Sequence, residues 1–133
     1  MTPHTFPVRV YYEDTDLAGI VYYANYLKFI ERGRSEWVRA RGLDQRRLKA
    51  EQGIVFAVRR VEADYLSPAR FDDELTVETV LEGMTAARLH LRQQVRRGDA
   101  VLFSALVTLV ALREDGAPAR IGTDLRSILA AAG

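Results

Sequence analysis

A chain of 133 residues can build one hydrophobic core and is too short for two, so we expect a single domain over residues 1–133. Nearly half of its residues are hydrophobic and about a quarter are charged, which is typical of a folded domain rather than a disordered chain. The net charge of +1 argues against nucleic acid as a partner, and the absence of cysteine excludes disulfides, thiolate nucleophiles and cysteine metal sites.

The same composition bears on membranes and on location in the cell. No apolar run approaches the ~20 residues that a membrane-spanning helix needs. The N-terminal stretch MTPHTFPVRV lacks the basic start and the apolar segment of a secretory signal. The sequence therefore predicts a cytoplasmic protein without a membrane span.

The first part of the chain predicts one strand and one long helix. Residues 6–12 alternate in the way of a half-buried strand, and residues 13–20 contain the Asp, Thr and Gly of a turn. After this turn, apolar side chains recur every 3.6 residues, which predicts a helix of about five turns that ends at Gly42. Gly33 lies on its apolar face, where the missing side chain indicates close packing against a sheet. A shorter helix should end at Gly53.

The rest of the chain is predicted to be mostly strand. Four segments are separated by short polar turns, so neighbours should pair antiparallel: residues 54–66, 75–82, 88–96 and 100–112. The last of them is apolar on both faces, as expected of a central or interface strand. This order predicts an α+β domain in which a curved antiparallel sheet wraps one long central helix. The far face of such a sheet is bare, which favours oligomerisation. The final TDLRSILAAA is either a short helix or a loose tail.

The two neighbouring aspartates Asp14 and Asp16 are the most distinctive polar feature. They do not form an EF-hand loop, because Ala18 would take position 5 and Asn25 would replace the bidentate Glu at position 12. An aspartyl phosphatase would place such a D-x-D pair on a parallel α/β sheet, which needs βαβ units that this chain lacks. The sequence therefore supports neither a calcium loop nor an aspartyl phosphatase.

The sequence also lacks the residue patterns of serine hydrolases and zinc enzymes. No serine lies in a G-x-S-x-G context, and His4 and His90 are far apart in the sequence. We expect His90 on the solvent side of a strand. For Asp14 we expect a structural role of the helix-capping type. For Asp16, a carboxylate that faces a helix N-terminus combines a nucleophile or base with an anion-binding site, which suits attack on a carbonyl.

Two segments, DTDLAGIVYYANYLKFIERGRSEW and ADYLSPARFDDELTVET, resemble the hotdog-fold acyl-CoA thioesterases of the 4-hydroxybenzoyl-CoA thioesterase family. The chain is most similar to the branch associated with the bacterial Tol–Pal envelope system, and the resemblance weakens after about Arg113. It implies a hotdog fold and a homotetramer built as a dimer of dimers, with active sites at subunit interfaces. The mechanism requires neither a metal ion nor a redox cofactor.

The resemblance also implies roles for individual residues. The catalytic carboxylate maps onto Asp16, and the N–H that polarises the thioester carbonyl maps onto Tyr23, in the first turn of the helix. Gly19 maps onto the glycine of the tight turn. Much of the Tol–Pal branch has histidine where this chain has Tyr23, whereas the aromatic-acyl thioesterases have tyrosine. The expected reaction is hydrolysis of a short-chain or aromatic acyl-CoA to a carboxylic acid and free CoA, with Asp16 as nucleophile or general base.

Further residues are candidates for holding the substrate. Arg88 at the start of one strand, with Arg59 and Arg60 on another, could contact the CoA phosphates, although a basic strand face is more often solvated surface. Val58 and Phe56 could line the acyl or pantetheine channel, with core packing as the default for both. A different class of function stays open, a non-catalytic acyl-CoA or acyl-carrier-protein binding module linked to envelope or lipid-synthesis machinery. Hotdog-fold dehydratases need a histidine near the site, which this chain does not offer.

Overall fold

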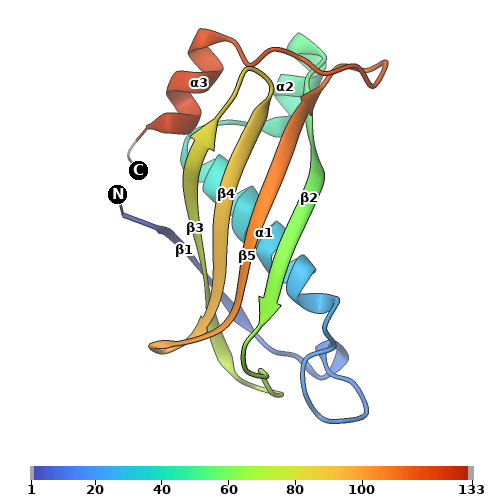
Figure 1. The fold of residues 1–133 in the computed structure, drawn as a ribbon, viewed down its shortest axis with the longest axis vertical. Coiled ribbons are helices and arrows are strands. Elements are labelled where there is room, and N and C mark those ends of the chain that lie inside the picture. The colour runs from blue at the N-terminus through green and yellow to red at the C-terminus, as the bar shows by residue number, and fades with distance from the viewer. Residues whose placement is uncertain (1, 132–133) are drawn as a thin grey trace.

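The computed structural model describes residues 2–131, and in it a curved five-stranded antiparallel sheet wraps one long helix (Figure 1). The strands lie in the order β1-β3-β4-β5-β2, and every neighbouring pair is antiparallel. This confirms the predicted fold class. In chain order the elements are β1 (His4–Arg9), a 3-10 turn (Tyr12–Asp14), α1 (Asn25–Ala40), α2 (Gln45–Gln52), β2 (Val55–Tyr65), β3 (Glu74–Met84), β4 (Arg88–Arg97), β5 (Ala100–Leu112) and α3 (Thr123–Ala130).

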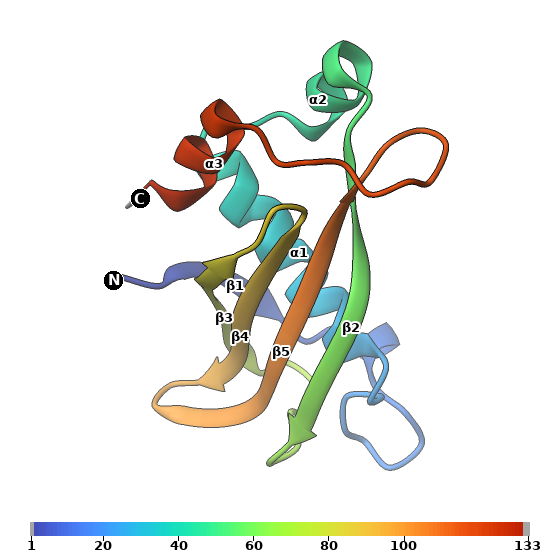
Figure 2. The same ribbon diagram turned by 45° about the horizontal axis from the view of Figure 1, so that its top comes forward.

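Helix α1 lies across the inner face of the sheet, and α2 and α3 both lie toward the end of the molecule where α1 finishes (Figures 1 and 2). The terminal TDLRSILAAA is thus mostly helical as α3, and its last residue is outside the described part of the chain. None of the helices within residues 2–131 is long and apolar enough to cross a membrane.

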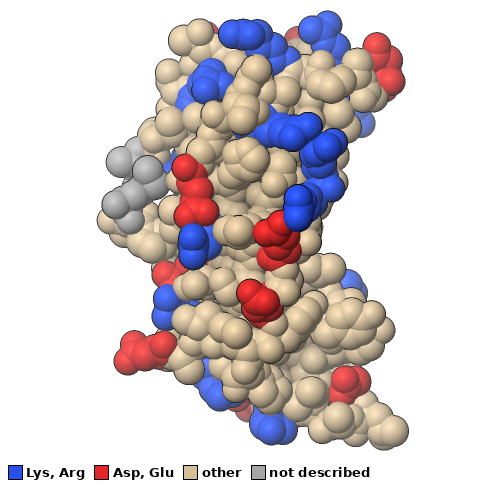
Figure 3. Space-filling model, viewed as in Figure 1, with Lys and Arg blue, Asp and Glu red and all other residues tan. Residues whose placement is uncertain are grey.

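Strand alternation decides which side chains enter the core. On β4 and β5 the inward-facing residues pair across the strands and are buried: Leu89 with Leu109, Leu91 with Val107, and Val95 with Phe103. The other face of the sheet is uncovered, and there His90 lies opposite Thr108, as predicted for a solvent-side residue. Basic side chains concentrate over the upper half of this face in Figure 3, where β2 begins. Strand β5 lies between β4 and β2, which confirms its predicted central place.

Gly33 allows α1 to approach β3 as closely as the sequence predicts. A Cβ atom added at Gly33 would lie 2.5 Å from Cγ1 of Val77 and 3.3 Å from its Cβ. Both residues are buried, and Val77 belongs to the hydrophobic core between helix and sheet. Any side chain at this position would therefore push the helix away from the strand.

Replacing Gly33 by alanine is expected to lower Tm by about 8 °C, equivalent to about 2 kcal/mol, because the added methyl group overlaps Val77. Thermal unfolding followed by circular dichroism measures this loss. Val77→Ala removes the overlapping methyl groups, so the double variant should lose less stability than the sum of the single variants. Strictly additive losses would contradict the contact.

The predicted boundaries near the N-terminus are wrong by several residues. Strand β1 ends at Arg9, because the chain then bends into the 3-10 turn instead of continuing extended to residue 12. Helix α1 begins only at Asn25 and has 16 residues, fewer than five turns. Tyr23 therefore lies just before the helix and not in its first turn. The N-cap residue is Ala24, which has no side-chain cap, so neither aspartate caps α1.

Candidate active site

The loop that carries Asp16 is a tight hairpin. The N–H of Asp16 donates to the carbonyl of Ile20, and the N–H of Gly19 donates to the carbonyl of Asp16, both at 2.9 Å. Gly19 has a φ of 78°, a left-handed conformation that closes a three-residue hairpin and that glycine adopts without strain. The turn role expected of Gly19 is therefore seen in the backbone.

The hairpin also orients the carboxylate of Asp16. Its Oδ1 accepts a hydrogen bond from the N–H of Ala18 at 2.9 Å, in an Asx-turn. Within the described residues, its second oxygen has no hydrogen-bond partner. One oxygen thus fixes the side chain while the other is free to act on a ligand.

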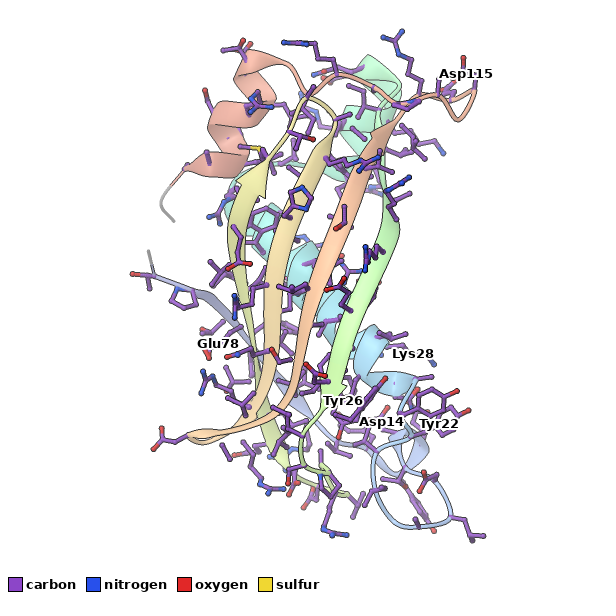
Figure 4. The ribbon with its side chains drawn as sticks, in the orientation of Figure 1. Asp14, Tyr22, Tyr26, Lys28, Glu78 and Asp115 are labelled. Carbon is purple, nitrogen blue, oxygen red and sulfur yellow. The ribbon has the colours of Figure 1, made fainter. Side chains whose placement is uncertain are left out.

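Asp14 has a structural role, as expected, but it does not cap the long helix. Its buried carboxylate accepts from the N–H of Tyr11 at 2.8 Å and so holds the 3-10 turn, not the long helix. Its carbonyl oxygen accepts from the N–H of Tyr22 and from the side-chain amide of Asn25, both at 2.9 Å. Figure 4 shows Asp14, Tyr22 and Tyr26 gathered near the lower end of α1. Asp14 therefore joins the loop to the start of the helix.

One backbone N–H group just before α1, that of Tyr23, is left without an acceptor by the described residues. Val21 and Tyr22 donate their N–H groups to Ala69 and Asp14, and Asn25 donates to Tyr22. In the described part of the chain, the N–H of Tyr23 has no acceptor. It also lies at the positive end of the α1 dipole, where a partial negative charge is stabilised. A carbonyl oxygen is the kind of group that such a donor binds.

Asp16 and Tyr23 line the same pocket. The pocket has a volume of about 380 Å³ and is called the tyrosine pocket below; its lining is Asp16, Ile20, Val21, Tyr22, Tyr23, Tyr26, Tyr65, Leu66, Ser67 and Pro68. A hydrogen bond to the Tyr23 side chain is the main factor that raises the pKa of Tyr22, and the charge of Asp16 acts in the same direction. The residues around the pocket therefore include a carboxylate with one unbonded oxygen, a residue with an unbonded N–H, and aromatic walls.

The other predicted binding residues lie elsewhere in this chain. Val58 lines a separate cavity of about 240 Å³ between α1 and the sheet, together with Phe56. Arg59 and Arg60 lie further along β2, so Arg59 is about 20 Å of strand away from Tyr65. Arg88 begins β4 at the opposite end of the sheet from the tyrosine pocket. One chain alone does not bring these residues to Asp16.

Sequence reasoning missed one wall of the pocket. Tyr65, Leu66, Ser67 and Pro68 come from the end of β2 and the loop after it. The segment ADYLSP, within the second stretch that carries the family resemblance, could have pointed to them. No group of three His, Cys, Asp or Glu side chains among the described residues is arranged to hold a metal ion.

Comparison with known proteins places the chain in a family. Residues 10–129 match the thioesterase-like superfamily. The acyl-CoA thioesterase YbgC of Haemophilus influenzae is 41% identical over 108 residues, covering 81% of this chain and 79% of the relative. The acyl-CoA thioester hydrolase YbgC of Escherichia coli O157:H7 is 40% identical over 105 residues, covering 79% and 78%.

Solved structures agree with this match. A probable thioesterase from Bartonella henselae superimposes with a TM-score of 0.86 at 36% identity, over 91% of this chain and all of that chain (100%). A 4-hydroxybenzoyl-CoA thioesterase, an aspartate-to-asparagine mutant complexed with 4-hydroxybenzoyl-CoA, superimposes with a TM-score of 0.91 at 25% identity, over 96% and 99%. The chain therefore belongs to the thioesterase-like superfamily and is a thioesterase of the hotdog fold.

Proposed function

We propose that the protein hydrolyses short-chain or aromatic acyl-CoA thioesters in the tyrosine pocket, to a carboxylic acid and free CoA. The observation that carries this proposal is that one pocket is lined both by Tyr23, whose N–H has no acceptor among the described residues, and by Asp16, whose carboxylate has one unbonded oxygen. The names of the curated relatives support acyl-CoA as the substrate.

In the proposed mechanism, the thioester carbonyl oxygen binds the N–H of Tyr23. Negative charge that develops on this oxygen is stabilised by that N–H and by the N-terminal end of α1, a contribution of several kcal/mol when the donor is preorganised. The Tyr23 side chain takes no part in this contact, so a histidine is not required there.

Asp16 supplies the second half of the reaction by one of two routes. Its free oxygen attacks the carbonyl carbon and expels the CoA thiolate, and water then hydrolyses the mixed anhydride. Alternatively, it takes a proton from a water molecule that attacks the same carbon. Both routes consume one water and release a carboxylic acid and CoA.

The walls of the pocket support the proposed substrate class. Four tyrosines and the apolar Ile20, Val21, Leu66 and Pro68 surround a volume that suits one aromatic ring or a short aliphatic chain. Purified protein mixed with short, medium, long and aromatic acyl-CoAs should release CoA thiol from the short or aromatic ones, as followed with a thiol-reactive dye. Release from long chains alone would contradict the substrate class. Acyl-CoA bound without any release would favour the binding-module alternative.

We further propose that two copies join through the free edge of β2 and that such dimers pair into a tetramer. Among the described strands β2 pairs only with β5, so the other edge of its 11 residues is open to a second strand. A two-fold axis at Val61 would place Arg60 opposite the partner's Glu62 on the outer face. It would also bring the partner's Val58 and Arg59 toward Tyr65, and so toward the tyrosine pocket.

Charge reversal tests this dimer. Arg60→Glu and Glu62→Arg should each weaken dimerisation about tenfold or more, because like charges then face each other across the axis. The double variant Arg60→Glu/Glu62→Arg restores opposite charges and should recover the wild-type dimer. Sedimentation equilibrium measures the dissociation constant of the dimer for the wild type and the three variants. A double variant weaker than both single variants would contradict this register.

A further inference from the structure

Tyr65 connects the end of β2 to Tyr23, which also lines the tyrosine pocket. It is the last residue of β2, and its side chain lies on the inner face, where the residue pairs with Phe103. Its hydroxyl donates a hydrogen bond to the carbonyl oxygen of Tyr23 at 3.0 Å. The two residues are 42 positions apart in sequence, so this contact depends on the tertiary fold.

This hydrogen bond replaces one that a regular helix would make. The carbonyl of Tyr23 would normally accept from the N–H of Leu27, four residues later. Instead, the N–H of Leu27 donates to the carbonyl of Ala24 at 3.1 Å, and none of the described backbone N–H groups reaches the carbonyl of Tyr23. The Tyr65 hydroxyl therefore supplies the partner of the Tyr23 carbonyl and ties the Tyr23 backbone, just before the helix, to the end of β2.

The ring of Tyr65 is itself held by neighbouring aromatic side chains. Its centroid lies 6.1 Å from that of Tyr23, 5.5 Å from Tyr26 and 5.0 Å from Phe103, in edge-to-face geometry. Tyr26 stacks on Phe103 at 5.0 Å, and its hydroxyl accepts from the N–H of Ala69 at 3.0 Å. Such packing restricts the orientation of the ring and of its hydroxyl. Burial raises the pKa of Tyr65 further above neutral, so the hydroxyl stays available as a donor, as for an ordinary tyrosine.

We propose that Tyr65 is a positioning residue, whose hydroxyl orients the Tyr23 backbone so that the Tyr23 N–H meets the thioester carbonyl oxygen. This role rests on the proposed function of the tyrosine pocket. A donor stabilises a developing oxyanion fully only when it already points at the oxygen, so a loosened Tyr23 lowers the rate of the chemical step more than it lowers substrate affinity.

Tyr65→Phe removes the hydroxyl and keeps the ring. We expect kcat to fall about tenfold, with KM changed less than twofold and Tm within about 2 °C of wild type. Tyr12→Phe is the matched control, since Tyr12 is 83% exposed and packs on Phe71 outside the pocket, and it should behave as wild type. An unchanged kcat in Tyr65→Phe overturns the role, and so does a large fall in Tm with unchanged kcat per folded molecule.

A second measurement separates this inference from the proposed function. If the wild-type protein releases CoA from no substrate, the proposed function fails. NMR amide signals then test the backbone geometry around Tyr23 independently of activity. Loss of the hydrogen bond should shift the amide signals of Tyr23 and Ala24 in Tyr65→Phe, because the carbonyl of the peptide group between them loses its partner. Signals that match wild type at both residues overturn the positioning role, whatever the enzymatic activity.

Discussion

Asp16→Asn is expected to slow CoA release by about a thousandfold or more and to leave the fold intact. Asparagine keeps an oxygen that can accept the hydrogen bond from Ala18, so the hairpin geometry should survive. It removes the free anionic oxygen, which is the group proposed to attack the carbonyl or to activate water. Steady-state kinetics with the best acyl-CoA of the substrate series measures the effect, and thermal unfolding checks the fold.

Asp115→Asn is a closely matched control for this variant. The carboxylate of Asp115 also accepts an N–H from two residues later, that of Ala117 at 2.9 Å, so the local motif is the same as at Asp16. Figure 4 shows Asp115 at the opposite end of the molecule from Asp14 and Tyr22. The control should retain full activity. Asp16→Asn with activity close to that of the control would contradict the assigned role of Asp16.

Gln93→Leu is expected to give a large loss of stability, about 3 kcal/mol or roughly 10 °C in Tm. Gln93 is fully buried, and its amide donates to the carbonyl of Ile30 and to the hydroxyl of Thr79, both at 2.9 Å. Its carbonyl oxygen accepts from Arg34 at 3.0 Å. Burial lowers the pKa of the Arg34 guanidinium, so this charge depends strongly on its hydrogen-bond partner. Leucine would leave Arg34 and Thr79 without that partner.

Two further variants test whether the lost hydrogen bonds cause this loss of stability. Gln94→Leu makes the same change one residue later, on the outer face of the sheet, and should cost less than about 1 kcal/mol. Adding Arg34→Met and Thr79→Val to Gln93→Leu removes the unpartnered groups and should recover part of the loss. Equal Tm values for Gln93→Leu and Gln94→Leu would show that the buried network contributes no net stability.

The long strands could be predicted because each follows one pattern over many residues. The predicted 100–112 coincides with β5, and 54–66 differs from β2 by one residue at each end. Gly33 was also predictable, since a glycine on an apolar helix face has few explanations besides close packing. These signals are local, so they do not depend on knowing the tertiary fold.

Features that depend on distant residues could not be predicted in this way. The helix begins at Asn25, and the carbonyl of Tyr23 just before it is bound by Tyr65, which is far away in sequence. Gln93 lies among apolar inward-facing positions, and nothing near it in sequence indicates Thr79 or Arg34 as its partners. The wall of the tyrosine pocket beyond β2 was missed for the same reason. Periodicity describes which face a residue occupies but not what meets it there.

The positions of the candidate residues along the chain explain why only part of the site could be predicted. Asp16, Gly19 and Tyr23 lie in one short segment, so one motif brings them together. Arg59 and Arg88 belong to strands whose relevant ends lie away from this segment. The proposed pairing of β2 would bring the partner's Arg59 toward this segment, whereas it does not account for Arg88 on β4.

The most direct test of the proposed mechanism is a crystal structure of Asp16→Asn with an intact short or aromatic acyl-CoA. A comparable aspartate-to-asparagine mutant of a 4-hydroxybenzoyl-CoA thioesterase has been solved with its substrate. We predict that the thioester carbonyl oxygen lies within hydrogen-bond distance of the N–H of Tyr23, with its carbon beside the side chain at position 16. A thioester bound away from the tyrosine pocket, for example in the cavity beside Val58, would contradict the central claim.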